Sequence, residues 1–462
     1  MNKEKSNFIK ALLEKGAGVY EVGGTVRDRL LGLEHKDRDL LVTSLPLTEL
    51  THLLKNFGEV LLVGKSFGVI KFYPKGEPHE SYDIALPRRE MSSGPGHRDF
   101  EISFDPSLPA EIDLSRRDFT INAMAKEIAT DRLVDPFNGQ EDLRNRLLRM
   151  VSDKAFEEDP LRILRGIQFA ARFQLTVEEK TYEAMSRNAS LIKTISAERI
   201  AEEIRKLLSA EKPSFGFILM QKTGVLKDIF PELEENVGVK QGNKFQDDDV
   251  FMHTMRVLDA SRKDTAIPYS GTLELMLSAL YHDVGKARTQ RFDPAKNRIT
   301  FYCHQTVSRK MAKKRFEALK FSTIGLKTEE TLNMIENHMF QTKSFFSERA
   351  IRRFINKIGP DVILKLVDLR IADNRGGRYP EGIRGVLKLR KRIGEELEKK
   401  TPFSIKDLAI NGHDMMKLGV PEGPLIGKSL KELLEVVLDD PSKNTREELM
   451  KIAEEKIKKE KK

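Results

Sequence analysis

The chain has 462 residues and a formal net charge of +9, from 80 lysines and arginines against 71 aspartates and glutamates. This length suits two to four domains, and the charge is compatible with a polyanionic partner without requiring one. No apolar run reaches the length of a membrane span, and residues 1–15 lack the apolar core of a signal peptide, so we expect a cytoplasmic protein without a membrane partner. The one cysteine, Cys303, excludes an intrachain disulfide, fits a reducing compartment and is expected to serve in packing.

The expected elements differ between the first part of the chain and the rest. Residues 18–135 alternate short strand-like runs with helical stretches, which is typical of a mixed sheet with helices packed on it. From about residue 140 onward apolar residues recur at helical spacing, most clearly over 156–173, and strand signals almost vanish. The pattern predicts the α+β fold class, with seams where proline, glycine and charge cluster, near 175, at 231–249 and at 374–382.

The stretch EVGGTVRDRLLG, residues 21–32, is typical of a strand end, a glycine turn and a helix start. Gly23 and Gly24 let backbone N–H groups and the helix N-terminus face an anion, and Arg27 adds positive charge nearby. Many glycine pairs of this kind bind nothing, so the turn alone is weak evidence for an anion site.

Three aspartates are candidates for metal-dependent catalysis. Asp37 and Asp39 are two apart on an expected strand, so both project from one face, which is unfavourable unless a divalent cation lies between them. Mg²⁺ takes carboxylate and phosphate oxygens together and is the natural ion. Asp83, in the strand-like run SYDIAL, is the third candidate. A solvated acidic loop at 37–39, and an ion pair of Asp83 with Arg88 or Arg89, are the alternatives. A glycine turn followed by Asp-x-Asp is typical of a nucleotidyl transferase.

Five motifs together resemble a known family. They are GGTVRD (23–28), DRD (37–39), RRDFTINAMA (116–125), EDPLRILR (158–165) and AERIAEE (197–203). Their order and spacing are similar to those of the class II tRNA CCA-adding enzymes and bacterial poly(A) polymerases, over roughly the first 235 residues. The resemblance implies a polymerase-β-like nucleotidyltransferase head at 1–140, followed by a helical neck and body at 141–235 for base selection and RNA binding.

The RRD motif supplies a cluster of polar residues. Arg116 and Arg117 can clamp phosphates, and Asp118 can accept a hydrogen bond from a ribose hydroxyl, which would favour ribonucleotides. Asn122 is expected to orient this cluster. The alternative is an ion-pair cluster at the start of a helix. The charged segment 88–109, interrupted by glycine and proline, is predicted to be a mobile loop over the nucleotide, and the resemblance implies that it helps to switch from C to A addition.

The EDPLR motif offers a way to choose bases without a template. Asp159 and Arg162 are three apart on an expected helix and so share a face. An acceptor beside a donor fork fits the Watson–Crick edges of cytosine and adenine, and excludes those of guanine and uracil. In the resembled family this motif has that role, and Arg165 in it is expected to bind nucleotide as well. An Asp159–Arg162 ion pair that only supports the fold is the alternative.

Histidines and aspartates form a second constellation after residue 251. His253, His282, Asp283 and Asp373 are spaced over helical segments, and imidazole with carboxylate suits Mn, Fe, Co, Ni or Zn better than Mg. The order H…HD…D resembles the HD phosphohydrolase superfamily, in which the matching residues hold a metal that activates water. In the extended form of that pattern, further histidines matching His304 and His338 hold a second metal or line the site. Lys286 could hold a phosphate. A degenerate remnant that only stabilises the fold is the alternative.

The resemblance implies an HD domain at 236–395 and a helical C-terminal region at 396–462 that touches tRNA. The predicted function is Mg²⁺-dependent, template-independent addition of CCA to tRNA 3′ ends from CTP and ATP, with an HD-type phosphohydrolase activity on RNA ends. DNA is not expected as a partner. The same motifs are compatible with a poly(A) polymerase or with an enzyme that adds only CC or only A. From another class, the protein could be an HD phosphohydrolase with an RNA-binding head.

Overall fold

The computed structural model describes residues 7–33, 38–63, 69–76, 80–92, 100–241, 249–341, 347–377, 380–399 and 401–460. The chain divides into two compact units. Unit 1 comprises Met1–Ala210 and Phe215–Ile229, and unit 2 comprises Glu211–Ser214 and Phe230–Lys462. The mixed sheet and the mainly helical remainder confirm the predicted fold class. None of the helices in the described ranges is long and apolar enough to cross a membrane.

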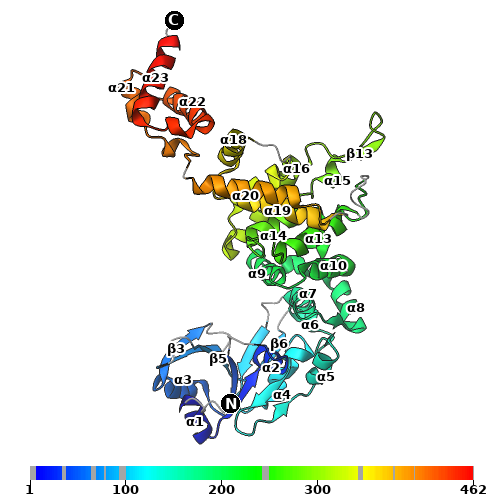
Figure 1. Ribbon diagram of the computed structural model, residues 1–462. Helices are drawn as coiled ribbons and strands as arrows, with labels where there is room; N and C mark the ends of the chain where they lie inside the picture. The colour runs from blue at the N-terminus through cyan, green and yellow to red at the C-terminus, as the bar shows by residue number, and fades with distance from the viewer. Residues whose placement is uncertain are drawn as a thin grey trace. The chain divides into compact units, whose positions relative to one another are not determined.

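Unit 1 is built on a seven-stranded sheet with the order β3-β4-β5-β2-β1-β8-β9 (Figure 1). Neighbouring strands are antiparallel except for β2 and β5, which are parallel. The strands are β1 Gly18–Val22, β2 Arg38–Thr43, β3 Gly58–Val63, β4 Val69–Pro74, β5 Tyr82–Ala85, β8 Ala125–Glu127 and β9 Leu133–Val134. The parallel pair at the centre of the sheet is the one that carries Asp39 and Asp83.

The two faces of this sheet have different coverings. Helices α1 (Asn7–Glu14) and α3 (Leu47–Lys55) pack on one face, against strand residues that include Leu40 and Val42. The opposite face contains Leu41 and packs on α4 (Ala110–Ser115). Because successive strand residues alternate between faces, Asp39 projects on the Leu41 face, away from α1 and α3.

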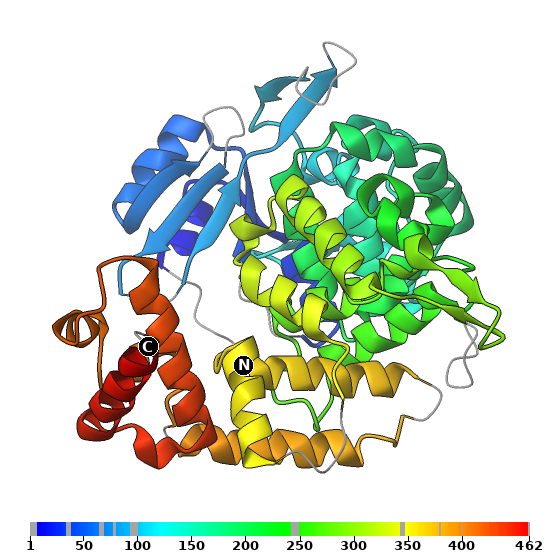
Figure 2. The ribbon, with the colours of Figure 1, turned by 90° about the horizontal axis from the view of Figure 1, so that it is seen from above.

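The segment 88–109, predicted to be a loop, forms a β-hairpin over part of its length. β6 (Arg88–Ser92) pairs antiparallel with β7 (Phe100–Phe104). Residues 93–99 of the predicted mobile loop lie outside the described residues, and the mobility of 88–109 stays a prediction. Figure 2 shows this hairpin projecting away from the seven-stranded sheet.

The remainder of unit 1 is helical. α7 begins after Pro160 and buries one apolar side from Leu161 to Phe173, as its periodicity predicted. It packs against α9. The remaining elements as far as residue 229 are α2 Gly24–Leu30, η1 Thr120–Asn122, α5 Gly139–Arg144, β10 Leu147–Leu148, α6 Ala155–Glu158, α7 Leu161–Phe173, β11 Thr176–Val177, α8 Glu179–Arg187, η2 Ala189–Thr194, α9 Ala197–Leu208, α10 Pro213–Thr223 and α11 Leu226–Ile229.

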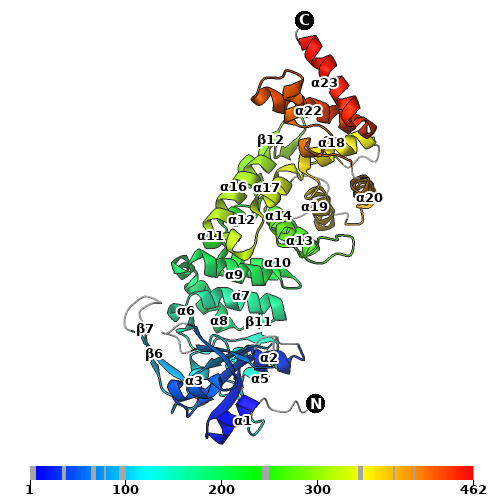
Figure 3. The same cartoon turned by 90° about the vertical axis from the view of Figure 1, so that its left-hand side faces the viewer.

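Unit 2 is a helical assembly with its core around α13, α14 and α19, and Figure 3 labels these helices together with α16 and α17. A short hairpin, β12–β13, interrupts the helices in a region that was expected to be mostly helical. Its elements are α12 Pro231–Glu234, α13 Val250–Arg262, α14 Leu273–Tyr281, α15 Lys286–Thr289, β12 Arg291–Asp293, β13 Arg298–Thr300, α16 His304–Ala318, η3 Phe321–Ile324, α17 Thr328–Asn337, α18 Glu348–Ile358, α19 Ile363–Gly376, α20 Arg384–Glu398, η4 Ile405–Asp407, α21 Gly412–Lys417, α22 Pro424–Asp439, η5 Pro441–Lys443 and α23 Arg446–Glu460.

The expectation that Cys303 packs in the interior is wrong. Its residue is exposed, and it precedes α16 with a positive φ of 61°. The turn that brings the chain from β13 into α16 passes through this residue, so the local backbone conformation keeps the side chain on the surface.

Candidate functional sites

A charged cleft of about 500 Å³ lies in unit 1. It brings together residues from all five motifs that carried the resemblance. The DRD motif contributes Asp39, and its first aspartate, Asp37, lies outside the described residues. The described lining is Gly24, Arg27, Asp39, Arg116, Arg117, Asp118, Asn122, Asp159, Leu161, Arg162, Arg165, Phe169 and Arg199. Six arginines against three aspartates make this lining positive, which suits a polyphosphate ligand.

The glycine turn at the edge of the cleft depends on the missing side chain. Gly23 has a φ of 64°, and a Cβ there would collide with Nη1 of Arg117. Its carbonyl accepts the Arg27 N–H at 3.1 Å, which starts helix α2. Glycine is therefore required for the strand-to-helix turn and for the close approach of the Arg117 guanidinium.

A chain of hydrogen bonds crosses the floor of the cleft. Nη1 of Arg27 donates to Oδ1 of Asn122 at 2.6 Å, and Nδ2 of Asn122 donates to Oδ1 of Asp118 at 3.0 Å. Nε of Arg165 donates to Oδ2 of Asp118 at 2.7 Å. Arg27 is buried, with its guanidinium 4.5 Å from the centre of the Phe173 ring, and burial lowers its pKa. Asn122 lies between the two charged groups, and its orienting role stays a prediction.

Asp118 is held more firmly than the sequence indicated. Oδ1 accepts the Phe119 N–H at 2.8 Å and the Asn122 amide, while Oδ2 lies 2.7 Å from both Nε and Nη2 of Arg165. Burial opposes the charged form, but Arg165 and these hydrogen bonds keep the pKa of Asp118 below its ordinary value. A carboxylate has about four lone-pair sites, so a ribose hydroxyl reaches this one only by replacing a donor.

Asp113, which the sequence analysis did not single out, holds the arginine pair. Nε of Arg116 donates to Oδ1 of Asp113 at 2.9 Å, and Nη2 of Arg117 donates to Oδ2 at 3.2 Å. Asp113 is fully buried, and these guanidinium groups hold its pKa low against the effect of burial. The signal was present as an aspartate three and four residues before two arginines, which places all three side chains on one helical face.

The two candidate aspartates of the sheet, Asp39 and Asp83, lie on adjacent strands. Asp39 on β2 and Asp83 on β5 are paired in register, so both side chains belong to one face of the sheet. Asp39 lines the cleft, whereas the Asp83 side chain is 47% exposed and has an ion pair with Lys71 at 3.9 Å. Lys71 is therefore one ion-pair partner of Asp83. The Arg89 side chain lies outside the described residues, so the pairing considered from the sequence stays a prediction.

The prediction that Asp159 shares a helix with Arg162 is wrong. Asp159 has φ −140° and ψ 98°, between α6 and α7, because the residue before a proline is disfavoured from helical conformation. Its Oδ1 accepts the Leu161 N–H at 3.1 Å, and its Oδ2 accepts Nη2 of Arg199 at 2.9 Å. Arg199 was not predicted, although it lies in the AERIAEE motif.

Arg162 also lines the cleft but has other partners. Its Nη2 donates to the Arg116 carbonyl at 2.8 Å, and its Nη1 donates to Oε2 of Glu158 at 3.2 Å. The described contacts contain no ion pair between Asp159 and Arg162, so the cleft presents an acceptor and a donor that are held separately.

Unit 2 contains two groups of metal-ligand type. His253 on α13, His282 after α14 and Asp373 on α19 form the first cluster, and Asp283, His304 and His338 form the second. In each cluster the candidate ligand atoms lie within 4.8 Å of one another. Helix packing thus places all six of the residues that were predicted for the HD site in adjacent positions.

Asp283 faces both clusters. Its Oδ2 lies 3.2 Å from Nε2 of His282 and 3.8 Å from Nε2 of His253. Its Oδ1 lies 3.2 Å from Nε2 of His304 and 3.7 Å from Nε2 of His338. A carboxylate with one oxygen toward each cluster has the geometry of a ligand shared by two ions.

The histidine rings are oriented by backbone carbonyl groups. Each Nδ1 lies within 3.2 Å of a carbonyl oxygen, and these oxygens belong to Gly376, Ala279, Phe301 and Ile335. An Nδ1–H that donates to a carbonyl leaves the Nε2 lone pair for a metal. Nε2 of His282 is buried without a hydrogen bond of good geometry, although Asp283 is near. The donor set therefore fits a divalent transition metal.

The charges within the clusters are strongly coupled. Burial disfavours a charged imidazole, but Asp283 and Asp373 raise the pKa of His282 to about 10. Burial and the neighbouring His282 lower the pKa of His338 to about 4. Lys286, expected to hold a phosphate, donates to Oδ2 of Asp283 at 2.6 Å and to Oε1 of Gln241 at 2.7 Å. It therefore contacts the shared carboxylate directly.

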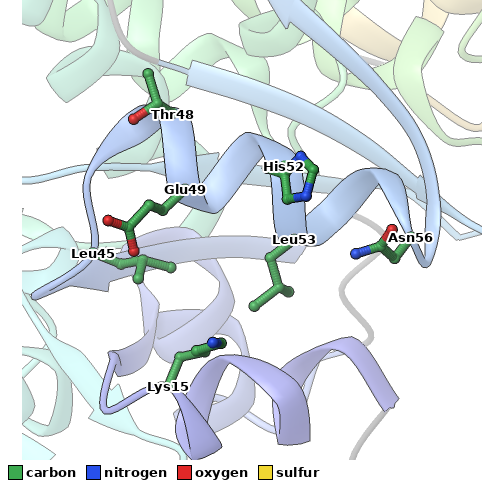
Figure 4. Close-up of a pocket in the computed structure, with 7 residues that line it drawn as sticks. All are labelled: Lys15, Leu45, Thr48, Glu49, His52, Leu53 and Asn56. Atoms are coloured by element: carbon green, nitrogen blue, oxygen red, sulfur yellow. The ribbon is translucent and has the colours of Figure 1, made fainter.

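A second cavity in unit 1, of about 480 Å³, lies between the end of α1 and helix α3 (Figure 4). Its lining is Lys15, Leu45, Thr48, Glu49, His52, Leu53 and Asn56. These helices cover the sheet face opposite Asp39, and the described lining contains no arginine. The cavity is therefore separate from the charged cleft.

Comparison with known proteins finds similarity along most of the chain. Family models match residues 19–149 ("Poly A polymerase head domain"), 174–236 ("Probable RNA and SrmB- binding site of polymerase A"), 250–375 ("HD domain") and 385–453 ("tRNA nucleotidyltransferase domain 2"). The four matches follow the predicted order of head, RNA-binding segment, HD domain and C-terminal region.

Curated relatives and solved structures agree with these matches. A multifunctional CCA protein of Haemophilus ducreyi is 38% identical over 274 residues, which is 58% of this chain and 64% of that protein. One from Vibrio parahaemolyticus is 36% identical over 308 residues, 65% of this chain and 71% of that protein. The chain thus spans just under two thirds of the first relative's length. The Bacillus stearothermophilus CCA-adding enzyme in complex with CTP shares the fold, with a TM-score of 0.71, 21% identity, and coverage of 98% of this chain and 97% of that one.

Proposed function

Because the chain belongs to the multifunctional CCA protein family, we propose that it adds CCA to tRNA 3′ ends from CTP and ATP. The observation that carries this proposal is the positive cleft of unit 1, in which motif residues far apart in the sequence meet around one ligand-sized volume. The excess of arginine matches the charge of a nucleoside triphosphate, and the acidic residues of β2 and β5 lie at the same sheet face.

Different residues of the cleft are proposed to bind the phosphates and the metal ion. The Gly23–Gly24 turn presents backbone N–H groups and the N-terminus of α2, while Arg116 and Arg117, fixed by Asp113, neutralise phosphate oxygens. Asp39 and Asp83, with Asp37, provide the hard oxygen donors that suit Mg²⁺. Bound there, Mg²⁺ supplies charge stabilisation for phosphoryl transfer.

Asp159 and Arg162 are proposed to read the base. The carboxylate offers an acceptor for the exocyclic amine of cytosine or adenine, and the guanidinium offers a donor for the adjacent ring nitrogen. Arg199 and Glu158 hold these groups in the ligand-free protein. Nucleotide binding would exchange those contacts for contacts to the base.

The test uses tRNA transcripts that end at the discriminator base, at C and at CC, with CTP and ATP supplied singly and together and the 3′ ends sequenced. Products that stop at CCA from all three transcripts are expected. Long A tails, or addition of only C or only A, would replace this function with one of its alternatives. Asp39→Ala should abolish addition, whereas Asp153→Ala, at an exposed position outside the cleft lining, should retain it.

The HD site supports a second activity, hydrolysis of phosphate esters at RNA ends. The supporting observation is the pair of clusters that share Asp283. His253, His282, Asp283 and Asp373 would hold one divalent transition metal, and Asp283 with His304 and His338 a second. Such an ion supplies water of lowered pKa as a nucleophile.

Hydrolysis at the HD site is tested separately from nucleotide addition by the head. RNA with a 3′-phosphate or a 2′,3′-cyclic phosphate is incubated with the protein and Mn²⁺, Co²⁺, Ni²⁺, Fe²⁺ or Zn²⁺. Asp39→Ala should retain this hydrolysis and His253→Ala should lose it. If Asp39→Ala leaves addition intact, or if only hydrolysis is found, the protein is an HD phosphohydrolase with an RNA-binding head.

We further propose the domain division 1–140, 141–235, 236–395 and 396–462, tRNA as the macromolecular partner and a cytoplasmic location. The separate family matches to the head, the RNA-binding segment, the HD region and the C-terminal segment support this organisation. Limited proteolysis followed by mass spectrometry tests the division. Cleavage is expected in the connections nearest to each boundary, because positions 140 and 395 lie within α5 and α20.

A further inference from the structure

The hairpin β12–β13 is inserted between two residues of the HD site. The chain leaves the site at Asp283, passes through α15 and the hairpin, and returns at His304, the first residue of α16. Figures 1 and 2 show the hairpin extending outward from the helices of unit 2. At its base, Nζ of Lys286 lies 5.6 Å from the centre of the Phe301 ring, so the hairpin base packs against a residue that contacts Asp283.

Two aromatic side chains of this segment are exposed. Phe292 on β12 and Tyr302, which follows β13, are each 61% exposed. Phe292 is paired with Ile299 across the hairpin, so these two lie on one side, and Arg291 and Arg298 belong to the other. Two large exposed aromatic side chains on one short segment, between two residues of the HD site, offer a surface for a partner.

Positive charge lies on the opposite side of the hairpin from Phe292 and next to Tyr302. Arg291 and Arg298 are exposed, and no ion pair involves either within the part of the chain described. Nζ of Lys296 donates to the Tyr302 hydroxyl and lies 5.0 Å from the ring centre. Asp293 is the one acidic residue of the two strands, and it pairs with Lys296 at 3.5 Å.

The positive surface continues along α16. Lys310, Lys313 and Lys314 are exposed and, with Thr306, recur at helical spacing on one side of the helix, starting next to Tyr302. From Cys303 to Lys314 this side is about 16 Å long at the usual helical rise. On the same helix, Arg309 is paired with Glu329 and Glu336, and Nζ of Lys313 lies 4.0 Å from Oε1 of Glu317.

We propose that the hairpin and the lysine face of α16 bind single-stranded RNA and present its 3′ end to the HD site. This inference rests on the proposed phosphohydrolase function. Aromatic faces beside cations that follow a line are the chemistry of single-strand binding, in which bases stack and the backbone is neutralised. Duplex RNA is recognised instead across its minor groove. Phe292 and Tyr302 stack bases, and the arginines and lysines contact phosphates.

The substrate consequence is a preference for oligonucleotides over mononucleotides. A nine-nucleotide RNA with a 2′,3′-cyclic phosphate and the mononucleotide 2′,3′-cyclic AMP are compared in the full-length, metal-loaded protein. Phe292→Ala should raise the KM for the oligonucleotide about tenfold, since each stacked base contributes substantially to binding, and leave mononucleotide hydrolysis unchanged. Phe292→Tyr should retain oligonucleotide binding and Phe292→Leu should not. Phe215→Ala, at another exposed aromatic, is the matched control.

The arginines are tested by salt dependence. Replacing both Arg291 and Arg298 by alanine should reduce the slope of log K against log salt by about 1.4, or about 0.7 for each lost phosphate contact. A single-stranded RNA should compete for the surface and a duplex of the same sequence should not. Equal competition by duplex would overturn the proposal.

Binding is read independently of hydrolysis through Cys303, the single thiol of the chain, which is exposed beside Tyr302. A fluorophore on Cys303 should respond to the oligonucleotide in the otherwise unchanged protein and lose that response in Phe292→Ala. If neither substrate is hydrolysed but the response is present, the phosphohydrolase function fails and the binding surface stands. If no response occurs and all variants process both substrates equally, the binding surface is refuted while the hydrolase function stands.

Discussion

Asp283 is the residue whose replacement distinguishes two coupled metal sites from one. Its Oδ2 faces His282 and its Oδ1 faces His304, each at 3.2 Å from the ring nitrogen. Asp283→Ala should therefore weaken metal binding at both clusters. His253→Ala should weaken only the first cluster, and His338→Ala only the second.

The magnitude follows from the position of the carboxylate. Loss of an outer-shell partner of a metal ligand typically costs 10- to 100-fold in affinity, and loss of a direct ligand costs no less than the upper part of that range. At about 100-fold, the cost is about 2.7 kcal/mol at each cluster. Each carboxylate oxygen of Asp283 faces a different cluster of metal-ligand residues. Replacing Asp283 should therefore weaken metal binding at both clusters.

The assay is a Co²⁺ titration followed by visible absorption, which reports imidazole ligation, with metal per chain measured after gel filtration. An Asp39→Ala background removes binding at the head. The Asp39→Ala protein is expected to bind two ions per chain. In that background, His338→Ala should bind one ion and Asp283→Ala fewer than one. Asp361→Ala, at an exposed position, is the control and should still bind two. Two tightly bound ions in His338→Ala, or one in Asp283→Ala with the same affinity as the parent, would refute the shared-carboxylate geometry.

Three further predictions concern base choice, sugar choice and protonation. Asp118→Ala should lower the ratio of kcat/KM for ATP to kcat/KM for dATP about tenfold, because about one charged hydrogen bond to the ribose is lost. An unchanged ratio would show that Asp118 does not bind the ribose hydroxyl. Arg162→Ala should admit UTP or GTP or stop incorporation; retained choice of C and A contradicts base reading. His282, with a pKa raised to about 10, is charged near pH 7.5, whereas the pKa of His338 is about 4. Since a metal ligand must be neutral, filling the first cluster should release about one proton and tighten as pH rises, and filling the second should release none from His338. Calorimetry in phosphate and in Tris measures this release, and heats that do not depend on the buffer would contradict it.

Local patterns in the sequence were sufficient for the family and for most of the candidate residues. The glycine pair at 23 and 24 and the periodicity of 161–173 are short-range signals, because turn geometry and helical faces are set by neighbours in the chain. The comparisons confirm the family that the motifs resembled. The error at Asp159 was avoidable, since Pro160 already disfavours helix at the preceding residue.

The partners of the charged residues could not be predicted in the same way. Asp118 pairs with Arg165, 47 residues away, and Arg199 reaches Asp159 across 40 residues. The Arg199–Asp159 pair exists because α7 and α9 pack together, and the Asp118–Arg165 pair because α7 packs against the segment after α4, where Phe169 contacts Phe119. Such packing depends on the apolar faces of whole helices rather than on the motif itself.

The amino-acid sequence by itself determined which chemical groups the protein carries, their order and the family to which they belong. Only the tertiary structure decided how those groups are used. It separated six HD residues into two clusters around Asp283, saturated Asp118 with donors, and exposed Phe292 and Tyr302 on the segment between Asp283 and His304. The reason is physical: a motif specifies residue types over a few positions, whereas distance, burial and charge coupling arise from helices and strands that meet only when the apolar surfaces of the chain are buried.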